Sequence, residues 1–434
     1  MIGGRPRVVV TGLGVVTSIG HDAGSFGEGL RRGACGVGRI EGTTASASAS
    51  TSASTSVRVA ARVRDFSWQR YVGGLEGRAA PLGARARKIL ANAPEGPRLA
   101  ACVALQAFLD ARLDEVPVAA EETGVVVAGS NLAPRYSSEA SEKFRQTGRV
   151  NPKYAIWALD SSQVGCVSEI LGARGIGLTA GGASGSGNVA VWSAVRALRA
   201  GDARCVLVCG ASADLGPLDL EAYGLLGAAL TESFEDEPER ASRPFDQRHR
   251  GFVWGEGAAG LVLETAESAE ERGVKVLCEI AGTSLVLDGT HLPSPSEEGE
   301  ARAMRGALAE AGLDPSEVGY VNAHGSSSPL GDACECAALR AVFDPSRPWV
   351  NSTKSLTGHC LNAAGLVELV ACALQLDQGF LHPNRNLEAP IDPSLRFVGS
   401  RAEPVEESWA LSNSFGFGGF NSSVLLHRLE SGGG

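Results

Sequence analysis

The amino-acid sequence predicts an α/β protein made of two similar halves, and two features of the chain lead to this prediction. Short apolar, β-branched segments alternate with longer segments of helical apolar periodicity, which is typical of layered folds with mostly parallel sheets. This succession of strand and helix starts again after the glycine-rich segment 251–264. We therefore expect one half at 1–265 and another at 266–434, although their sequences are not visibly repeated.

The first half is expected to open with a strand at 7–10, which ends in a turn at 11–14. Segment 43–56 contains only Thr, Ser and Ala and has no residue able to form a core. We expect a disordered surface insertion there. Apolar spacing predicts the remaining elements of this half: a helix at 98–113, strands at 123–128 and 175–180, a helix at 188–199, a strand at 205–209 and a glycine-rich strand within 251–264.

The second half is expected to repeat this alternation of strands and helices. The same apolar spacing predicts a strand at 274–280, a helix at 298–311, a strand at 320–323, helices at 333–342 and 363–374, and closing strands at 410–411 and 422–427. The pattern alone therefore predicts a layered α/β enzyme in two halves.

Composition and charge exclude several classes of protein. The 434 residues are 44% hydrophobic and 20% charged, with a net charge of −10, which is typical of a globular protein with a large core. No run of Lys and Arg interleaved with aromatic residues occurs, so we expect no nucleic-acid partner. The N-terminus lacks a signal peptide, and the chain has no apolar run of about 18 residues. We therefore predict a soluble, cytoplasmic protein that does not insert into a membrane.

The cysteine pattern gives no sign of a disulfide framework or a metal site. Ten cysteines are scattered without a CxxC pair, and the pair Cys334 and Cys336 lacks a second pair of ligands. Segment 185–190 matches a dinucleotide-binding GxGxxA pattern, but the acidic residue expected after the next strand is missing. We expect free thiols in a reducing compartment, and neither a metal nor a bound cofactor.

Five segments of the chain carry motifs of high specificity. They read VVVTGLGVVTSIG (8–20), SRPFDQRHRGFVWGEGAAGLVLE (242–264), YVNAHGSSSPLGD (320–332), NSTKSLTGHCLNAAG (351–365) and SNSFGFGGFN (412–421). Together they resemble the ketosynthases of fatty-acid and polyketide synthesis, above all the 3-oxoacyl-carrier-protein synthase II branch of the thiolase superfamily. The resemblance covers nearly the whole chain, apart from the Ser/Ala/Thr insertion and weak stretches to about residue 165.

This resemblance implies a thiolase-like fold, in which two duplicated halves form a layered α-β-α-β-α sandwich. It also implies an acyltransferase whose substrates are carried on the phosphopantetheine arm of an acyl carrier protein. The family further implies a homodimer, or a heterodimer with another ketosynthase. The strand at 205–209 is expected to pair across the two-fold axis of that dimer.

The family's site contains a cysteine, two histidines and a supporting lysine, and most of it maps onto this chain. The histidines correspond to His324 in the NAHG motif and His359 in the KSxxGH motif, and the lysine to Lys354. Two neutral imidazole N–H donors suit the thioester oxygen that becomes an enolate when a malonyl group loses carbon dioxide. Lys354 is expected to position a histidine and to tune the local charge. We interpret the other histidines as core or surface residues: His21, His249, His291, His382 and His427.

The sequence departs from the family at the nucleophile. Segment 175–190 reads GIGLTAGGASGSGNVA, and counting forward from Gly175 places Ser184 at the position of the cysteine. Counting back from Gly201 gives the same result, whereas a rival alignment that places Gly181 there needs an insertion. A helix N-terminus lowers the pKa of a thiol but does not ionise a serine hydroxyl. Ser184 therefore needs a general base, and one of the two motif histidines could serve.

The resemblance also implies roles for residues around the nucleophile. Phe417 of the GFGG motif would be the gating aromatic, and its backbone N–H and that of Ser184 would form the oxyanion hole. Ser326 and Ser328 stand where the family has threonines that bind the pantetheine arm. Phe420 replaces a small hydroxyl residue, which indicates a reshaped pocket. We expect buried scaffolding at three structural polar positions: Asp332, Glu335 and Glu368.

Three functions remain open from the sequence. In the first, Ser184 takes an acyl group from a carrier protein and passes it to a malonyl-derived carbanion or another acceptor. In the second, His324, His359 and Lys354 only decarboxylate malonyl-carrier protein. In the third, the chain is a non-catalytic partner of a true ketosynthase, as chain-length factors are. The retained histidines and lysine speak against the third function, and we favour acyl transfer in polyketide or fatty-acid-type biosynthesis.

Overall fold

The computed structural model describes residues 6–40, 55–231 and 234–429 of the chain. Its central feature is a sheet of 11 strands, in the order β13-β11-β10-β15-β16-β9-β1-β8-β6-β4-β5. In chain order these strands are β1 (Val8–Thr17), β4 (Thr123–Ala128), β5 (Gly177–Ala180), β6 (Cys205–Ala211), β8 (Gly257–Thr265), β9 (Cys278–Leu287), β10 (Tyr320–Asn322), β11 (Trp349–Asn351), β13 (Arg396–Phe397), β15 (Trp409–Gly416) and β16 (Phe420–His427).

The strand order repeats between the two halves of the chain. Across the sheet it is β5-β4-β6-β8-β1 in the first half and β11-β10-β15-β16-β9 in the second. When these five strands of each half are numbered by chain order, without the short edge strand β13, both series run third, second, fourth, fifth, first. The two series meet where residues 8–10 of β1 pair with residues 278–280 of β9. The predicted duplicated α/β fold is therefore confirmed, whereas the division at residue 265 stays a prediction.

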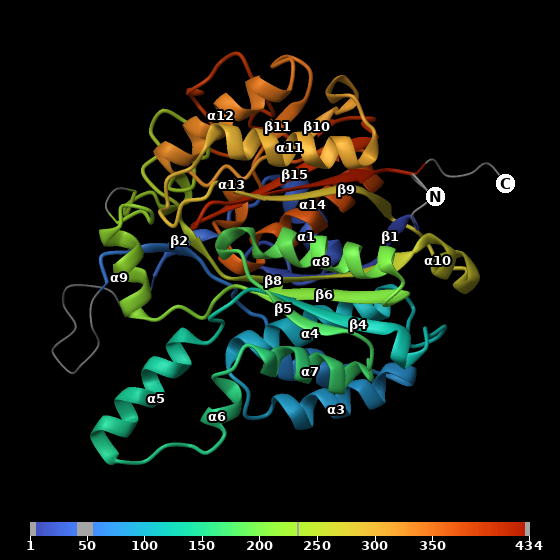
Figure 1. Cartoon of the computed structure of the whole chain (residues 1–434). Helices are drawn as coiled ribbons and strands as arrows, with labels where there is room; N and C mark the ends of the chain where they lie inside the picture. The colour runs from blue at the N-terminus through green and yellow to red at the C-terminus, as the bar shows by residue number, and fades with distance from the viewer. Residues whose placement is uncertain (1–5, 41–54, 232–233, 430–434) are drawn as a thin grey trace.

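Helices lie on both sides of each half of the sheet, so that the chain forms five layers, α-β-α-β-α (Figure 1). The outer face of the first half is covered by α3 (Ala80–Leu90), α4 (Glu95–Asp110) and α7 (Ser161–Leu171), and that of the second by α11 (Glu297–Ala311) and α12 (Pro329–Val342). The middle layer contains α8 (Ser186–Ala200) and α14 (Ala364–Gln378), which contact strands of both halves. Helix α14 is buried along most of its length, as expected for a helix that is apolar on all sides.

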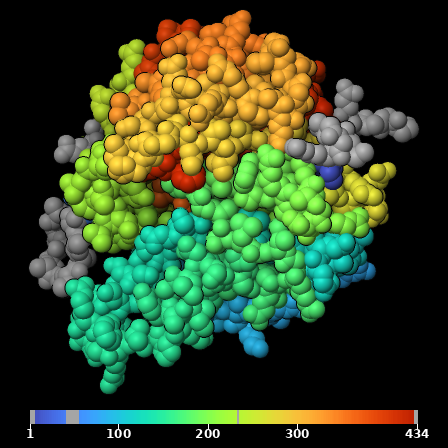
Figure 2. All heavy atoms as spheres, viewed as in Figure 1, coloured from blue at the N-terminus to red at the C-terminus, as the bar shows by residue number. Residues whose placement is uncertain are grey.

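The remaining elements connect these layers. They are α1 (Ala23–Arg32), β2 (Val37–Arg39), β3 (Val59–Ala61), α2 (Trp68–Gly73), α5 (Pro134–Thr147), α6 (Tyr154–Trp157), α9 (Pro217–Leu225), β7 (Trp254–Gly255), α10 (Ala266–Arg272), α13 (Lys354–Thr357), β12 (Phe380–Leu381) and β14 (Glu403–Pro404). Helices α5 and α6 project from the body at the lower left of Figures 1 and 2. In the described part of the chain, no helix is both long and apolar enough to cross a membrane.

The sheet differs from the expectation of mostly parallel strands. Its centre, from β6 through β8, β1, β9 and β16 to β15, is antiparallel, and only its two ends are parallel. Strands β15 and β16 are joined only by residues 417–419. A parallel pair needs a crossover of a dozen or more residues, so this connection permits only antiparallel pairing.

The prediction that the strand at 205–209 pairs with another chain in a dimer is also wrong. The segment 205–209 belongs to β6, which lies between β4 and β8 in the sheet. Both edges of β6 are therefore already paired, and it has no free edge for another chain. The free edge of the first half belongs to β5.

Most other elements begin and end within a few residues of the predicted positions. Two strands differ more. The strand expected at 7–10 continues as β1 to Thr17, so that the turn expected at 11–14 is wrong, and the strand expected at 274–280 is β9, which begins only at Cys278 and runs on to Leu287. The predicted disordered insertion 43–56 lies outside the described residues up to residue 54. Its last two residues differ from the prediction, since Thr55 is buried and the Ser56 backbone N–H donates to Glu221 at 2.6 Å.

Candidate active site

Ser184 lies on a sharp turn between β5 and α8. It occupies a single 3₁₀ turn, Ala183–Gly185, directly before the first residue of α8. The φ angle of Ala183 is +49°, in the left-handed region that a residue with a Cβ rarely adopts. Strand β15 passes close by, because a Cβ built on Gly416 would lie 2.3 Å from the carbonyl oxygen of Gly182. The strained turn and this close approach present Ser184 at the N-terminus of α8.

His359 contacts Ser184 directly. Its Nε2 lies 3.0 Å from Ser184 Oγ, and its Nδ1 accepts a hydrogen bond of 3.2 Å from the backbone N–H of Leu361. A neutral imidazole carries one proton, and a nitrogen that accepts an N–H bond cannot carry it. The proton of neutral His359 is therefore on Nε2, which donates to the oxygen of Ser184.

His324 is held in the matching tautomer by Lys354. The ammonium nitrogen of Lys354 lies 3.3 Å from His324 Nδ1 and donates to the carbonyl oxygen of His324 at 2.5 Å. It also forms a buried ion pair with Glu368. Because an ammonium group only donates, His324 Nδ1 accepts and its Nε2 carries the proton. The rings of His324 and His359 are nearly perpendicular, at 82°, with their centroids 5.4 Å apart.

Burial decides the charge of both histidines. It lowers the pKa of His324 and of His359 well below the ordinary value of 6.5, and the nearby Lys354 ammonium lowers both further. Burial also raises the pKa of Glu368 to about 7, although Lys354 opposes this shift. At neutral pH both imidazoles are uncharged, and each carries its proton on Nε2.

Buried acids shape the loop that carries His324. Glu335 accepts hydrogen bonds of 2.8 Å from the backbone N–H groups of His324 and Gly325. Asp332 accepts from the N–H of Ser327 at 3.1 Å and contacts Nδ1 of His249 at 2.8 Å. Both acids are almost completely buried, so they act as rigid supports of the loop that carries His324.

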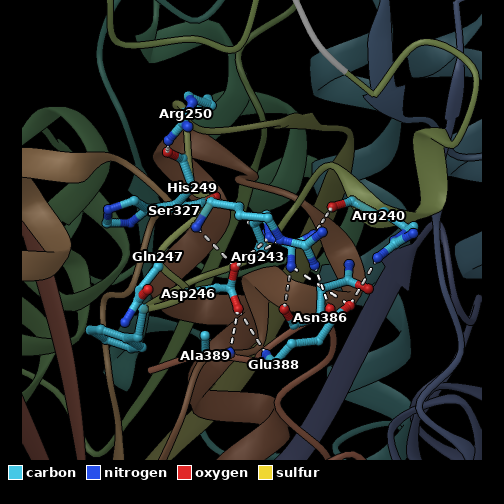
Figure 3. A network of polar contacts seen from close by, with 12 residues as sticks. Arg240, Arg243, Asp246, Gln247, His249, Arg250, Ser327, Asn386, Glu388 and Ala389 are labelled. Carbon is cyan, nitrogen blue, oxygen red and sulfur yellow. Dashed lines mark hydrogen bonds and ion pairs between the residues drawn. The ribbon is translucent and has the colours of Figure 1, made fainter. Parts of the chain in front are cut away.

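A second loop, residues 242–250, contacts the segments that carry Lys354 and His324. No residue of this loop was predicted to belong to the site. The hydroxyl of Ser242 donates to the carbonyl oxygen of Lys354 at 2.6 Å, and the backbone N–H of Arg243 donates to Ser327 Oγ at 3.1 Å. Figure 3 shows the guanidinium of Arg243 at the centre of a polar network, in which it pairs with Asp246 at 2.9 Å. Arg243 is completely buried, which the letters of the SRPFD motif alone do not reveal.

The predicted site residues other than Lys354, which is buried behind His324, line one cavity of about 460 Å³. A second chamber of about 290 Å³ adjoins it. The two chambers share seven lining residues: Leu226, Ala228, His324, Ser326, Ser328, Phe415 and Phe417.

The predicted gate and the predicted arm-binding serines lie at the junction of the two chambers. Phe417 is 37% exposed and borders both cavities. The hydroxyls of Ser326 and Ser328 lie 2.9 Å apart. Phe420, which we expected to reshape the pocket, lines neither chamber and faces Gly182 instead. The catalytic, gating and binding roles of these residues stay predictions.

The family models of the beta-ketoacyl synthases match this chain in both halves. The N-terminal domain of that family matches residues 5–269 and its C-terminal domain residues 277–388. The chain therefore belongs to the beta-ketoacyl synthase family, and the predicted thiolase-like ketosynthase fold is confirmed. No cluster of three potential metal-ligating side chains occurs in the part of the chain that the structure describes.

Relatives and solved structures are similar to the chain over nearly its whole length. The polyketide biosynthesis malonyl-ACP decarboxylase PksF of Bacillus subtilis (strain 168) is 36% identical, over 99% of this chain and 98% of that protein. The 3-oxoacyl-[acyl-carrier-protein] synthase 2 of Vibrio harveyi is 32% identical, over 98% of this chain and 99% of that protein. A beta-ketoacyl synthase from Burkholderia phymatum STM815 superposes with a TM-score of 0.85 at 28% identity, covering 98% of this chain and all of that chain. The ishigamide ketosynthase/chain length factor gives 0.84 at 27%, with the same coverage.

Proposed function

We propose that the chain acts on acyl-carrier-protein thioesters and decarboxylates malonyl-ACP to acetyl-ACP. The observation that carries this proposal is the tautomer of the two histidines. Leu361 and Lys354 occupy the Nδ1 atoms of His359 and His324, so that both imidazoles carry their proton on Nε2. The Nε2–H of His359 rests on Ser184 Oγ and passes to the substrate oxygen when the thioester binds. Two preorganised neutral donors are suited to a thioester oxygen on which negative charge develops.

The reaction needs no nucleophile from the protein. The bond between the malonyl carboxylate and the α-carbon breaks, carbon dioxide leaves, and the electron pair moves into the thioester as an enolate. The Nε2–H groups of His324 and His359 stabilise the enolate oxygen. The α-carbon then takes up one proton from water, which gives the acetyl thioester. Burial, aided by the charge of Lys354, lowers the pKa of both imidazoles and keeps them neutral, so that they donate without losing protons.

Serine fits this reaction better than cysteine. A thiolate at the N-terminus of α8 would place a negative charge close to the incoming malonyl carboxylate and would oppose its binding. The hydroxyl of Ser184 is neutral and adds no such repulsion. The similarity over 99% of this chain to a Bacillus subtilis protein named as a malonyl-ACP decarboxylase also supports the proposal.

Acyl transfer through Ser184 is the second candidate. It is favoured by the 3.0 Å contact between Ser184 Oγ and His359 Nε2. To act as a base, however, His359 would have to move its proton to Nδ1, where the Leu361 N–H already points. The decarboxylation reaction avoids this conflict, so we rank it first.

The test is the release of carbon dioxide from malonyl-ACP by purified variants. We expect Ser184→Ala to keep the rate within about threefold, and His324→Ala and His359→Ala to lower it at least about 100-fold, the usual cost of losing one oxyanion donor. The exposed His291 provides the matched control, His291→Ala, which should leave the rate unchanged.

A loss of carbon dioxide release in Ser184→Ala would contradict this proposal. Intact-mass spectrometry after incubation with acyl-carrier proteins separates the two candidates. An acyl-sized mass gain that disappears in Ser184→Ala would establish acyl transfer instead.

We also propose a dimer that forms along the free edge of β5, in place of the strand expected from the sequence. Leu178 on this edge strand is 38% exposed. Further large apolar side chains are exposed on the projecting segment that contains α5 and α6: Phe144, Ile156 and Leu159. An unpaired edge with exposed apolar side chains favours pairing with another chain. The partner is a second copy or a related ketosynthase, and the acyl carrier protein is the substrate donor.

A further inference from the structure

The second chamber leads from the surface to His324. It is lined on one side by the loops that carry Ser326, Ser328 and Phe417, and on the other by the start of α11. Leu330, which is 74% exposed, lies among its lining residues and marks the open side. A substrate arm that enters here would reach the junction with the first chamber, where the two histidines lie.

Glu300 in the first turn of α11 is an unusual wall residue. It lines the second chamber and is only 1% exposed. Its carboxyl group forms a hydrogen bond with the side chain of Cys334, but its Oε2 has no hydrogen-bond partner. Burial, with Glu335 nearby, raises its pKa well above the ordinary value of 4.5. A buried polar atom without a partner is costly, and its retention calls for an explanation.

The other polar side chains at this wall are already engaged. Asp288 accepts from the side-chain amide of Asn421 at 2.8 Å, and the hydroxyls of Ser326 and Ser328 bond to each other. Among the described residues that line the second chamber, Glu300 alone has a buried side-chain atom without a partner. Apart from the Nε2–H of His324 at the inner end, which the proposed reaction uses, the open buried hydrogen-bonding position of the chamber is therefore at Glu300.

We propose that Glu300 binds an amide group of the pantetheine arm as the arm passes through the second chamber, and so selects carrier-type thioesters. This rests on the proposed function, in which the substrate is an acyl-carrier-protein thioester. The unpartnered Oε2 can donate to the carbonyl oxygen of an amide when it carries the proton, or accept from the amide N–H when it does not. Glu300 is thus a specificity residue, distant from the bond that breaks.

The experiment compares malonyl-pantetheine with S-ethyl malonyl thioester, which has the same reacting group but no amide. We expect Glu300→Leu to lower kcat/KM for malonyl-pantetheine about tenfold, mainly through KM, because the amide loses its partner. The same variant should leave S-ethyl malonyl thioester unchanged. Glu300→Gln keeps a donor and an acceptor and should retain the activity of the wild type towards both.

The exposed Glu298 in the same helical turn provides the matched control, Glu298→Leu. Equal losses with both substrates, equal losses in the control, or no loss in Glu300→Leu would each overturn the proposal. Ligand-observed NMR titration with S-methyl-pantetheine makes the test independent of turnover. If the chain releases no carbon dioxide but binds this probe about tenfold more weakly in Glu300→Leu, the proposed function fails and the role of Glu300 stands.

Discussion

At the scale of single residues, the position of one proton on each imidazole decides the chemistry of the site. Ser184, His324, His359 and Lys354 were all predicted from motifs, and the structure brings them within contact of one another. The sequence could not show the tautomers, because these depend on Leu361 N–H and on the direction in which the Lys354 ammonium points.

The burial of Glu300 could not be predicted from the sequence either, because it also depends on tertiary packing. It is one of three acidic residues in the first turn of α11, and Glu297 and Glu298 beside it are exposed. Acidic residues in a first turn usually compensate the helix dipole at the surface. Only the packing of the second half against α11 buries one of the three.

A pH measurement tests another buried residue, His382. Its Nε2 lies 3.0 Å from Thr353 Oγ1, and burial lowers its pKa from 6.5 to about 4. The folded state therefore takes up a proton less readily than the unfolded state, and stability present above pH 6.5 is lost as the pH falls towards 4. We expect His382 to account for about 2 kcal/mol of lost unfolding free energy between pH 7 and pH 5.

Urea unfolding at both pH values checks this expectation. The His382→Gln variant should lose about 2 kcal/mol less than the wild type over the same interval, whatever its stability at pH 7. Equal losses in the two proteins would show that His382 does not contribute to the pH dependence.

At the scale of elements, the loop 242–250 supports both histidine motifs from one side. It reaches Lys354 through Ser242, and the loop after His324 through Arg243 and Ser327. The sequence predicted the helices and strands of the core well, because their apolar spacing is regular. It could not predict this loop's role, because its contacts are with residues 84 and 112 positions away.

Replacing Arg243, the central arginine of this loop, should lower the free energy of unfolding. Arg243→Leu leaves the buried carboxylate of Asp246 without its guanidinium partner, and we expect a loss of about 3–5 kcal/mol in the free energy of unfolding. Arg248 also faces Asp246, at 3.7 Å, but is 46% exposed. Arg248→Leu is therefore the control and should cost less than about 1 kcal/mol. Similar losses in the two variants by urea unfolding would contradict this account.

At the scale of the whole molecule, the duplicated fold was predictable and the position of each strand in the sheet was not. The fully apolar segment 205–209 was expected at a dimer interface, but it lies inside the sheet. A strand covered on both faces and paired on both edges has the same apolar sequence as one buried against another chain. The edge strand β5 is only four residues long and gave no comparable signal.

The proposed dimer makes a prediction about size in solution. Leu178→Glu places a charge on the free edge of β5, and we expect it to reduce the mass from twice the 44.7 kDa of one chain towards that of a monomer. Leu287→Glu, at an exposed position of β9 away from this edge, should leave the mass unchanged. Light scattering with gel filtration measures both variants, and a wild-type monomer would refute the interface.

The middle layer of the fold has a consequence for synthesis on the ribosome. Helix α8 contacts α14, β9 and β16, all of which are translated after it. Ser184 and His359 are 175 positions apart, so the hydroxyl and its imidazole partner exist together only once most of the chain has emerged. Until then α8 and β8 lack the cover of α14, which exposes apolar surface and slows folding that depends on distant contacts. The nascent chain is therefore prone to aggregation until its second half has folded.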